Sequence, residues 1–168
     1  MKKITLMSSM ILLLVACSTT RLTPEQKVVK GAWVVQQVQE AIDSRKMTIE
    51  MNYVTPFRSG LKHLDYGYDI RLSGDTLYSY LPYYGRAYSV PYGGGKGLIF
   101  NAPIRDMGVS YPKKGLTRID ILVQNEEDQY IYMIDLLDNG HADLLVRSRE
   151  REQISFSGEL KMEEKDEK

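Results

Sequence analysis

The sequence contains one cysteine and two histidines, and its 22 Lys and Arg residues balance its 22 Asp and Glu residues. A single cysteine excludes any disulfide bond within the chain. The absence of a basic excess argues against nucleic acid as a partner, because phosphate binding needs clustered positive charge. With so few histidines and no recognisable cofactor motif, we expect no metal and no cofactor.

The rest of the composition is that of an ordinary globular protein. Hydrophobic residues make up 43% and charged residues 26% of the 168 residues, which excludes wholesale disorder. A chain of this length forms one domain with a substantial core, even without disulfide bonds.

Residues 1–16 have the pattern of a bacterial secretion signal. Lys2 and Lys3 precede an apolar run over residues 4–15, and Leu14-Val15-Ala16-Cys17 resembles a lipobox. The run is about 12 residues long, whereas a transmembrane helix needs about 20. We expect cleavage before Cys17, transfer of a diacylglycerol to its thiol and acylation of its new amino group. The alternatives are an ordinary signal peptide with a chance cysteine and a buried N-terminal helix.

In this interpretation residues 17–23 form a short tether, so the domain lies close to the membrane. Ser18 stands where aspartate would retain an enteric lipoprotein in the inner membrane, which by analogy predicts sorting to the outer membrane. Surface-exported lipoproteins of gut anaerobes carry an acidic cluster after the cysteine, and its absence here favours the periplasmic face. Loss of Lys2 and Lys3 leaves a slight acidic excess, so lipid rather than charge is expected to hold the chain at the membrane.

The segment that follows has the pattern of an amphipathic helix. Thr23 can cap its first turn and Pro24 suits the first helical position. Apolar residues then recur at spacings of three and four, at Val28, Ala32, Val35, Val38 and Ile42. We expect one helix from Pro24 to about Asp43, with Trp33 anchored in the core.

After the helix, the apolar period changes from 3.6 to 2, which is typical of half-buried strands. Turns at Ser73-Gly74-Asp75 and Asp138-Asn139-Gly140 predict two hairpins. Strands are predicted over residues 47–53, 68–72, 76–80, 117–123, 130–137, 141–147 and 154–162, with weaker ones over 96–102 and 107–111. We predict an α+β fold in which the N-terminal helix packs on a mostly antiparallel, curled sheet of about eight strands.

Residues that could carry catalysis do not form a recognisable set. His63 lies two positions before Asp65, which is only a weak metal signal. Asp120 and Asp135 lie in different predicted strands, and their spacing does not show whether they approach each other. The glycine run at residues 93–97 lacks the spacing of a phosphate-binding loop. We therefore predict no catalytic residues and no metal ligands.

One segment stands out for its aromatic content, because eight of the twelve tyrosines lie between Tyr66 and Tyr92. Tyrosine offers flat apolar area and a hydroxyl at small entropic cost, which suits the binding of peptides or sugars. The alternative is that these tyrosines pack a long ordered loop onto the sheet. The predicted ligand-binding residues are Tyr78, Tyr80, Tyr83, Tyr84, Arg86, Tyr88 and Tyr92.

The same segment carries a resemblance to a known family. Its motifs are Tyr80-Leu81-Pro82-Tyr83-Tyr84-Gly85-Arg86-Ala87-Tyr88, Pro91-Tyr92-Gly93-Gly94 and Gly97-Leu98-Ile99-Phe100. Together they resemble the signature of domain-of-unknown-function family 4251, and Asn139-Gly140-x-Ala142 and Ile154-Ser155-Phe156-x-Gly158 fit it too. The resemblance implies a small secreted or lipid-anchored protein of a gut-type anaerobe. It implies no activity and no catalytic residue, because the family has none established.

Taken together, these patterns predict a lipid-anchored outer-membrane protein that faces the periplasm. Residues 24–162 form a single domain, after a signal peptide (1–16) and a lipidated cysteine with its tether (17–23), and residues 163–168 form a charged, disordered tail. We expect a non-catalytic binding or interaction module. Its expected partners are the membrane, reached through the lipid, and an envelope protein, peptide or glycan. The alternatives are a hydrolase of envelope polymers that uses paired carboxylates and a structural partner of an outer-membrane complex.

Overall fold

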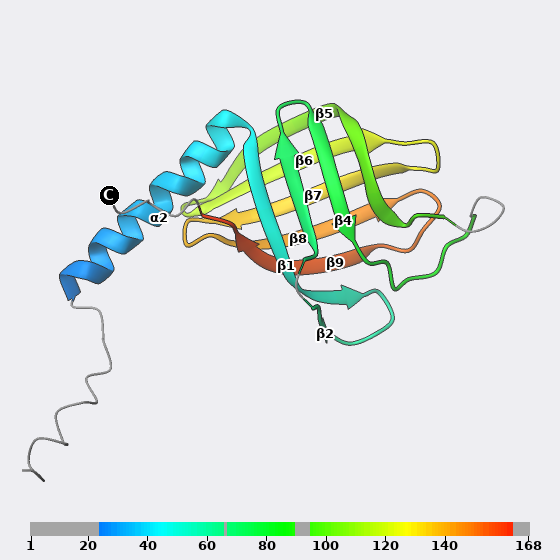
Figure 1. The fold of residues 1–168 in the computed structure, drawn as a ribbon, viewed down its shortest axis with the longest axis horizontal. Helices are drawn as coiled ribbons and strands as arrows, with labels where there is room; N and C mark the ends of the chain where they lie inside the picture. The colour runs from blue at the N-terminus through cyan, green and yellow to red at the C-terminus, as the bar shows by residue number, and fades with distance from the viewer. Residues whose placement is uncertain (1–23, 66, 90–94, 163–168) are drawn as a thin grey trace, which may run out of the picture. The chain divides into compact units, whose positions relative to one another are not determined.

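The computed structural model describes residues 24–65, 67–89 and 95–162. These residues contain one helix and nine strands. The helix, α2, spans Pro24–Ser44. The strands are β1 (Lys46–Pro56), β2 (Lys62–His63), β3 (Asp69–Ser73), β4 (Thr76–Leu81), β5 (Leu98–Lys113), β6 (Leu116–Gln124), β7 (Gln129–Leu137), β8 (His141–Ser148) and β9 (Ile154–Leu160). Neighbours run antiparallel in the order β1, β3, β4, β5, β6, β7, β8, β9, and β2 pairs with β1 outside this series (Figure 1).

Strand β1 closes the sheet into a barrel, because it pairs with β3 on one side and with β9 on the other. A bulge between Met51 and Tyr53 shifts the β1–β9 register. The predicted α+β fold with a curled sheet is therefore wrong: the protein is a mostly β, closed antiparallel barrel of eight strands, with one helix among the residues that the structure describes. The period of two in the sequence specifies which face a side chain takes but not which strands are neighbours. Closure pairs the two edges that a curled sheet leaves unpaired.

Alternate side chains of the barrel strands point inward and fill the barrel as a hydrophobic core. Tyr130 and Tyr132 are among the largest fully buried side chains. The Tyr132 hydroxyl donates to Ser79 Oγ (2.9 Å), which in turn donates to the carbonyl oxygen of Leu98 (2.7 Å). These polar atoms in the core therefore have partners, as burial requires.

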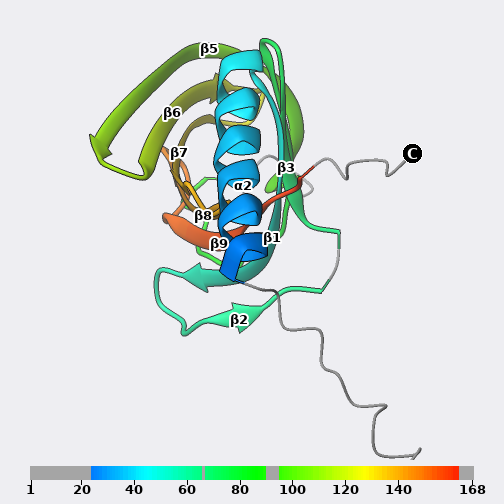
Figure 2. The same ribbon diagram turned by 90° about the vertical axis from the view of Figure 1, so that its left-hand side faces the viewer.

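The C-terminal part of α2 lies across one end of the barrel (Figure 2). Val38, Ala41 and Ile42 are buried in the same core cluster as the inward barrel residues. Trp33, which we expected in the core, is half-buried and lies outside that cluster. Arg45 has a left-handed backbone (φ 51°) and turns the chain from α2 into β1. Among the described residues, no helix combines the length and the apolar character needed to cross a bilayer.

The helix and both predicted hairpins are confirmed, with their turns between β3 and β4 and between β7 and β8. The two weak strands predicted at 96–102 and 107–111 are a single strand, β5. A bulge between Ile104 and Asp106 shifts the β5–β6 register without ending the pairing, so the alternation breaks while the strand continues. Strand β2 was not predicted, because two residues are too few to show a period.

Candidate functional site

The loop that follows β4 lies at the end of the barrel opposite α2. Helix α2 leads directly into the start of β1, and strand directions alternate around the barrel, so β4 finishes at the other end. The β6–β7 turn and the β8–β9 turn lie at that same end. We call this end the far end; it comprises residues 82–89, 95–97, 125–128 and 149–153.

Tyr83 connects the loop after β4 to the β8–β9 turn. Its hydroxyl lies 2.9 Å from the carbonyl oxygen of Arg86 and 2.8 Å from that of Glu152. The Arg151 guanidinium lies over its ring, 5.5 Å from the ring centre. Burial, assisted by the nearby Glu152 carboxylate, raises the pKa of Tyr83 to about 12. Tyr83 therefore has the contacts of a packing residue, which agrees with the packing alternative for this one tyrosine.

Glu152 is a buried acid of the far end that connects three segments. Its Oε1 accepts a hydrogen bond from Arg58 Nε (2.7 Å), and its Oε2 accepts one from the backbone N–H of Arg86 (3.3 Å). Its own backbone N–H donates to the carbonyl oxygen of Arg86 (2.9 Å). A second ion pair, between Arg151 and Glu127 (2.9 Å), joins the β6–β7 and β8–β9 turns. These contacts close the far end with paired charges.

The pairing of Glu152 predicts a loss of stability in acid. The hydrogen bond from Arg58 holds the pKa of Glu152 below its usual value, and the N–H of Arg86 adds to this. A depressed pKa contributes stability above the pKa of the unfolded state, about 4.3, and that stability is lost as the pH falls through the lower folded value. We expect Glu152→Gln to have a lower Tm than the native chain at pH 7 and a shrinking difference on acidification. Thermal unfolding followed by circular dichroism at several pH values measures this, and a difference that stays constant would contradict it.

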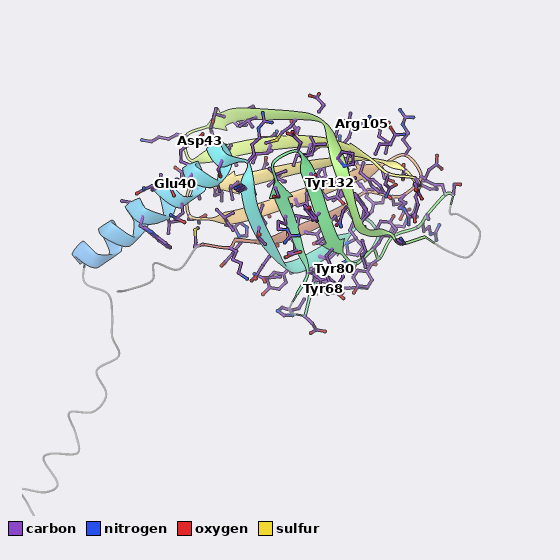
Figure 3. All side chains as sticks on the ribbon, turned by 45° about the horizontal axis from the view of Figure 1, so that its top comes forward. Glu40, Asp43, Tyr68, Tyr80, Arg105 and Tyr132 are labelled. Atoms are coloured by element: carbon purple, nitrogen blue, oxygen red, sulfur yellow. The ribbon has the colours of Figure 1, made fainter. Side chains whose placement is uncertain are left out.

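Three other tyrosines of the segment lie on the outside of the barrel, and a fourth, Tyr68, packs against both the core and one of them. Tyr78 and Tyr80 take outward positions on β4, and Tyr80 is 50% exposed. Tyr68 stacks against Tyr80 with ring centres 5.6 Å apart (Figure 3). Tyr84, 46% exposed, follows β4. We call Tyr68, Tyr78, Tyr80 and Tyr84 the tyrosine face.

Cations from neighbouring strands cover two rings of the tyrosine face. The guanidinium of Arg71, on β3, lies 4.3 Å from the ring centre of Tyr78, and Lys62 Nζ, on β2, lies 4.9 Å from that of Tyr84. Such contacts hold the rings in place and put positive charge beside the hydroxyls. The tyrosine face therefore combines apolar area, hydroxyl groups and cations, a set that can bind a ligand with both flat and polar parts.

The structure divides the predicted ligand-binding residues into groups. The tyrosine face includes Tyr78, Tyr80 and Tyr84, and Tyr83 belongs to the packing of the far end. Tyr88 is 68% exposed and lies in the loop after β4. Arg86 contributes backbone groups to the far end while its side chain is exposed. Tyr92 and the expected lipidation site Cys17 lie outside the described residues.

Three residues beside or within the tyrosine face were not predicted: Tyr68, Lys62 and Arg71. The hairpin register could have found Arg71, because it lies directly opposite Tyr78 in the β3–β4 ladder. Tyr68 immediately precedes β3, and its position beside Tyr80 also follows from that hairpin. Lys62 gave no signal in the sequence, since its contact with Tyr84 depends on how β2 folds back along β1.

Arginine side chains bind three acids of the barrel and its turns: Asp135, Glu127 and Glu152. Asp135 forms two 2.7 Å hydrogen bonds with Arg118, which hold the pKa of Asp135 below its usual value. Glu127 and Glu152 each bind an arginine as described above. In the described part of the chain, no three His, Cys, Asp or Glu side chains gather as metal ligands would. The paired-carboxylate alternative therefore receives no support from Asp135, Glu127 or Glu152.

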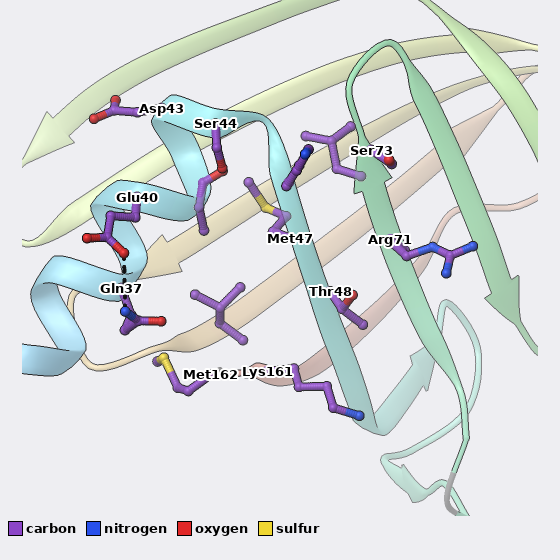
Figure 4. Close-up of a pocket in the computed structure, with 14 residues that line it drawn as sticks. Gln37, Glu40, Asp43, Ser44, Met47, Thr48, Arg71, Ser73, Lys161 and Met162 are labelled. Carbon is purple, nitrogen blue, oxygen red and sulfur yellow. Dashed lines mark hydrogen bonds between the residues drawn. The ribbon is translucent and has the colours of Figure 1, made fainter. Parts of the chain in front are cut away.

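A groove with a volume of about 1430 Å³ lies between α2 and strands β1 and β3 (Figure 4). Its helix wall carries Glu40 and Asp43, and its opposite wall carries Lys46, Arg71 and Lys161. Arg71 and Lys161 already contact an aromatic ring and a carboxylate of the strands. Charges of both signs line the groove without converging on one point, so we place the candidate site at the tyrosine face.

Comparison with known proteins decides the family. A model described as a domain of unknown function, DUF4251, matches residues 31–160. The chain belongs to the DUF4251 family. This confirms the resemblance seen in the sequence. The DUF4251 match begins within α2 and ends at the last residue of β9, so it includes the whole barrel and the tyrosine face.

A solved DUF4251 structure has a similar fold. The crystal structure of a DUF4251 family protein from Bacteroides eggerthii matches with a TM-score of 0.60 and 16% sequence identity. The match covers 80% of this chain and 91% of that chain. No curated protein matches the sequence. At this identity the likeness concerns the fold alone, and the DUF4251 description assigns no role to any residue.

Proposed function

We propose that this DUF4251 protein is a lipid-anchored, non-catalytic binding module of the cell envelope, and that its ligand binds at the tyrosine face. The observation that carries the proposal is the tyrosine face, in which Tyr80 and Tyr84 are exposed and two rings are covered by cations, on a barrel whose interior is filled by its own core. With the interior occupied by side chains, the outer wall is the surface that offers a ligand aromatic contact.

The anchoring part of the proposal rests on the N-terminal sequence. Lys2 and Lys3, the apolar run over residues 4–15 and the lipobox-like segment ending at Cys17 support acylation at Cys17. Ser18 supports sorting to the outer membrane, with the barrel on the periplasmic side. Several acyl chains give firm attachment where a single one is marginal.

The chemistry of the tyrosine face favours an envelope peptide or glycan as ligand. Tyrosine rings stack on sugar rings or on peptide side chains, and their hydroxyls form hydrogen bonds at little entropic cost. Arg71 and Lys62 add charge-assisted donors beside Tyr78 and Tyr84. Peptidoglycan presents both sugars and peptides with carboxylates, so purified sacculi are the first probe.

Binding to sacculi tests the proposal. We expect the double variant Tyr80→Ala/Tyr84→Ala to lose about tenfold in affinity, because it removes two exposed rings that the core does not use. Its Tm is expected to stay close to that of the native chain. The matched control is Ile131→Ala on β7, an apolar residue of similar exposure (42%) away from the tyrosine face. Co-sedimentation with sacculi measures the affinity.

A third variant separates binding from packing. Tyr83→Ala removes the anchor of the loop after β4, so we expect it to lower the Tm. If Tyr80→Ala/Tyr84→Ala lowers the Tm as Tyr83→Ala does and binds sacculi like the native chain, the tyrosine face is a packing feature and the proposal fails. Competition with soluble glycan chains or with stem peptides then identifies the part of the polymer that is bound.

A further inference from the structure

The loop between β1 and β2 exposes two large apolar side chains. Phe57 is 60% exposed and Leu61 is 64% exposed. Loops of this kind usually carry polar turn residues, whereas here two apolar side chains flank Ser59 and Gly60. We call residues 57–61 the hairpin tip. Figure 1 shows β2 and this loop outside the wall of the barrel, so the core makes no use of the hairpin tip.

Contacts with β1, the core and Glu152 hold the hairpin that carries the hairpin tip in place. Strand β2 pairs with β1, and Leu64, just after β2, is buried in the core. The backbone N–H of Leu64 donates to the carbonyl oxygen of Asn52 (2.8 Å), which ties the base of the hairpin to β1. Within the hairpin tip, Arg58 binds the buried Glu152 (2.7 Å). These contacts hold the hairpin while Phe57 and Leu61 remain in solvent.

The residues next to the hairpin tip have the chemistry of a lipid interface. Lys62 follows the hairpin tip and lies over the exposed ring of Tyr84. Tyr53 is 40% exposed, and its ring centre lies 5.2 Å from that of His63 in a T-shaped arrangement. Tyrosine rings and lysine side chains favour the boundary between an apolar layer and water. The apolar side chains at the end of the hairpin suit the acyl-chain region of a bilayer. The tyrosines and Lys62 next to them suit its headgroup region.

The two sequence stretches that carry the hairpin tip and β4 contain no acidic residue. No acidic residue occurs between Glu50 and Asp65 or between Asp75 and Asp106. These two stretches include the hairpin tip, β2, β4 and the loop after β4. In a chain whose total charge is balanced, the charged residues of both stretches are therefore basic. Arg58 is already paired with Glu152, so Lys62 is the cation beside the hairpin tip that complements anionic headgroups.

We propose that the hairpin tip inserts Phe57 and Leu61 into the interface of a bilayer that contains anionic phospholipid. Contact through two side chains is weak and reversible by itself. An anchored chain raises the effective concentration of the hairpin tip at the bilayer, so the inference rests on the proposed lipid anchor for proximity. It shares Lys62 and Tyr84 with the tyrosine face, but its test uses no ligand of that face. A second contact besides the lipid fixes how the barrel is oriented toward the membrane.

Quenching by brominated lipid tests the insertion. The full chain is reconstituted in vesicles of phosphatidylethanolamine and phosphatidylglycerol whose acyl chains carry bromine, with Trp33→Phe removing the native indole. In that background Leu61→Trp reports on the hairpin tip. Tyr111→Trp is the matched control, because Tyr111 is 63% exposed on β5 and lies away from the hairpin. We expect brominated lipid to lower the fluorescence about twofold for Leu61→Trp and to leave Tyr111→Trp nearly unchanged.

The outcomes separate the possible failures. Absence of quenching at Leu61→Trp overturns the insertion and leaves a protein partner as the occupant of the hairpin tip. Equal quenching at both positions overturns it as well, because the barrel then contacts lipid through no preferred surface. Weaker quenching when phosphatidylcholine replaces phosphatidylglycerol, or when Lys62→Glu is added, supports the anionic preference, and unchanged quenching overturns that preference. Flotation of the same vesicles reports separately whether the chain is attached at all.

Discussion

Replacing Gly158 by alanine is expected to disrupt the closure of the barrel and to cost about 3 kcal/mol or more of unfolding free energy. Gly158 lies in β9 opposite Met51 of β1, next to the bulge of β1. A methyl group at Gly158 overlaps the carbonyl oxygen of Glu50 and lies 2.9 Å from the Cα of Met51. These are backbone atoms, so no side-chain rotation relieves the overlap and the two strands must separate.

A second glycine in a strand provides the control. A methyl group at Gly108, in β5, meets nothing within 4 Å. We expect Gly108→Ala to change the stability by less than about 1 kcal/mol in either direction, since the same substitution there adds no overlap and only restricts the unfolded chain. Urea unfolding followed by circular dichroism measures both variants. If Gly158→Ala unfolds at the same urea concentration as Gly108→Ala, the β1–β9 contact is looser than the structure describes.

The second large effect is expected in the polar chain inside the core. Ser79→Ala leaves the buried Tyr132 hydroxyl without its acceptor, which costs about 1–3 kcal/mol. Burial raises the pKa of Tyr132, so the hydroxyl stays in the neutral form that donates. Tyr132→Phe removes the same hydrogen bond from the other side but leaves Ser79 able to donate to Leu98. We therefore expect Tyr132→Phe to be the milder of the two changes.

A double-mutant cycle makes this test quantitative. Once Tyr132→Phe has removed the hydroxyl, Ser79→Ala no longer orphans a donor, so the double variant is expected to be more stable than the sum of the single losses predicts, by about 1 kcal/mol. Unfolding free energies of the two single variants and the double variant in urea give the coupling. Strict additivity would show that the two hydroxyls do not share a bond in the folded protein.

Local patterns in the sequence predicted much of the fold. The apolar spacing predicted α2, and the turns with Gly74 and Gly140 predicted the β3–β4 and β7–β8 hairpins. Both turn glycines have positive φ, which explains why these turns could be recognised from residue type alone. The closed barrel could not be predicted in this way. Its closing contact joins Met51 to Gly158. Nothing in the sequence around position 158 shows that its neighbour in the fold is a residue more than one hundred positions earlier.

The candidate site was predicted as a segment but not as a surface. Aromatic content located the tyrosines between positions 66 and 92, and the β-strand period placed Tyr78 and Tyr80 on one face. The pattern could not show that Tyr83 turns to bind the carbonyl oxygen of Glu152. It also gave no reason to add Lys62, which reaches Tyr84 from a strand that was not predicted.

The sequence by itself determined the helix, most strands, two hairpins and membership of the DUF4251 family, because these depend on residue types a few positions apart. Only the tertiary structure decided that the strands close into a barrel, which tyrosines pack and which face solvent, and that Phe57 and Leu61 stay exposed. The physical reason is the distance along the chain. Burial and closure arise from contacts such as Glu50 with Gly158 and Tyr83 with Glu152, whose partners no local period connects.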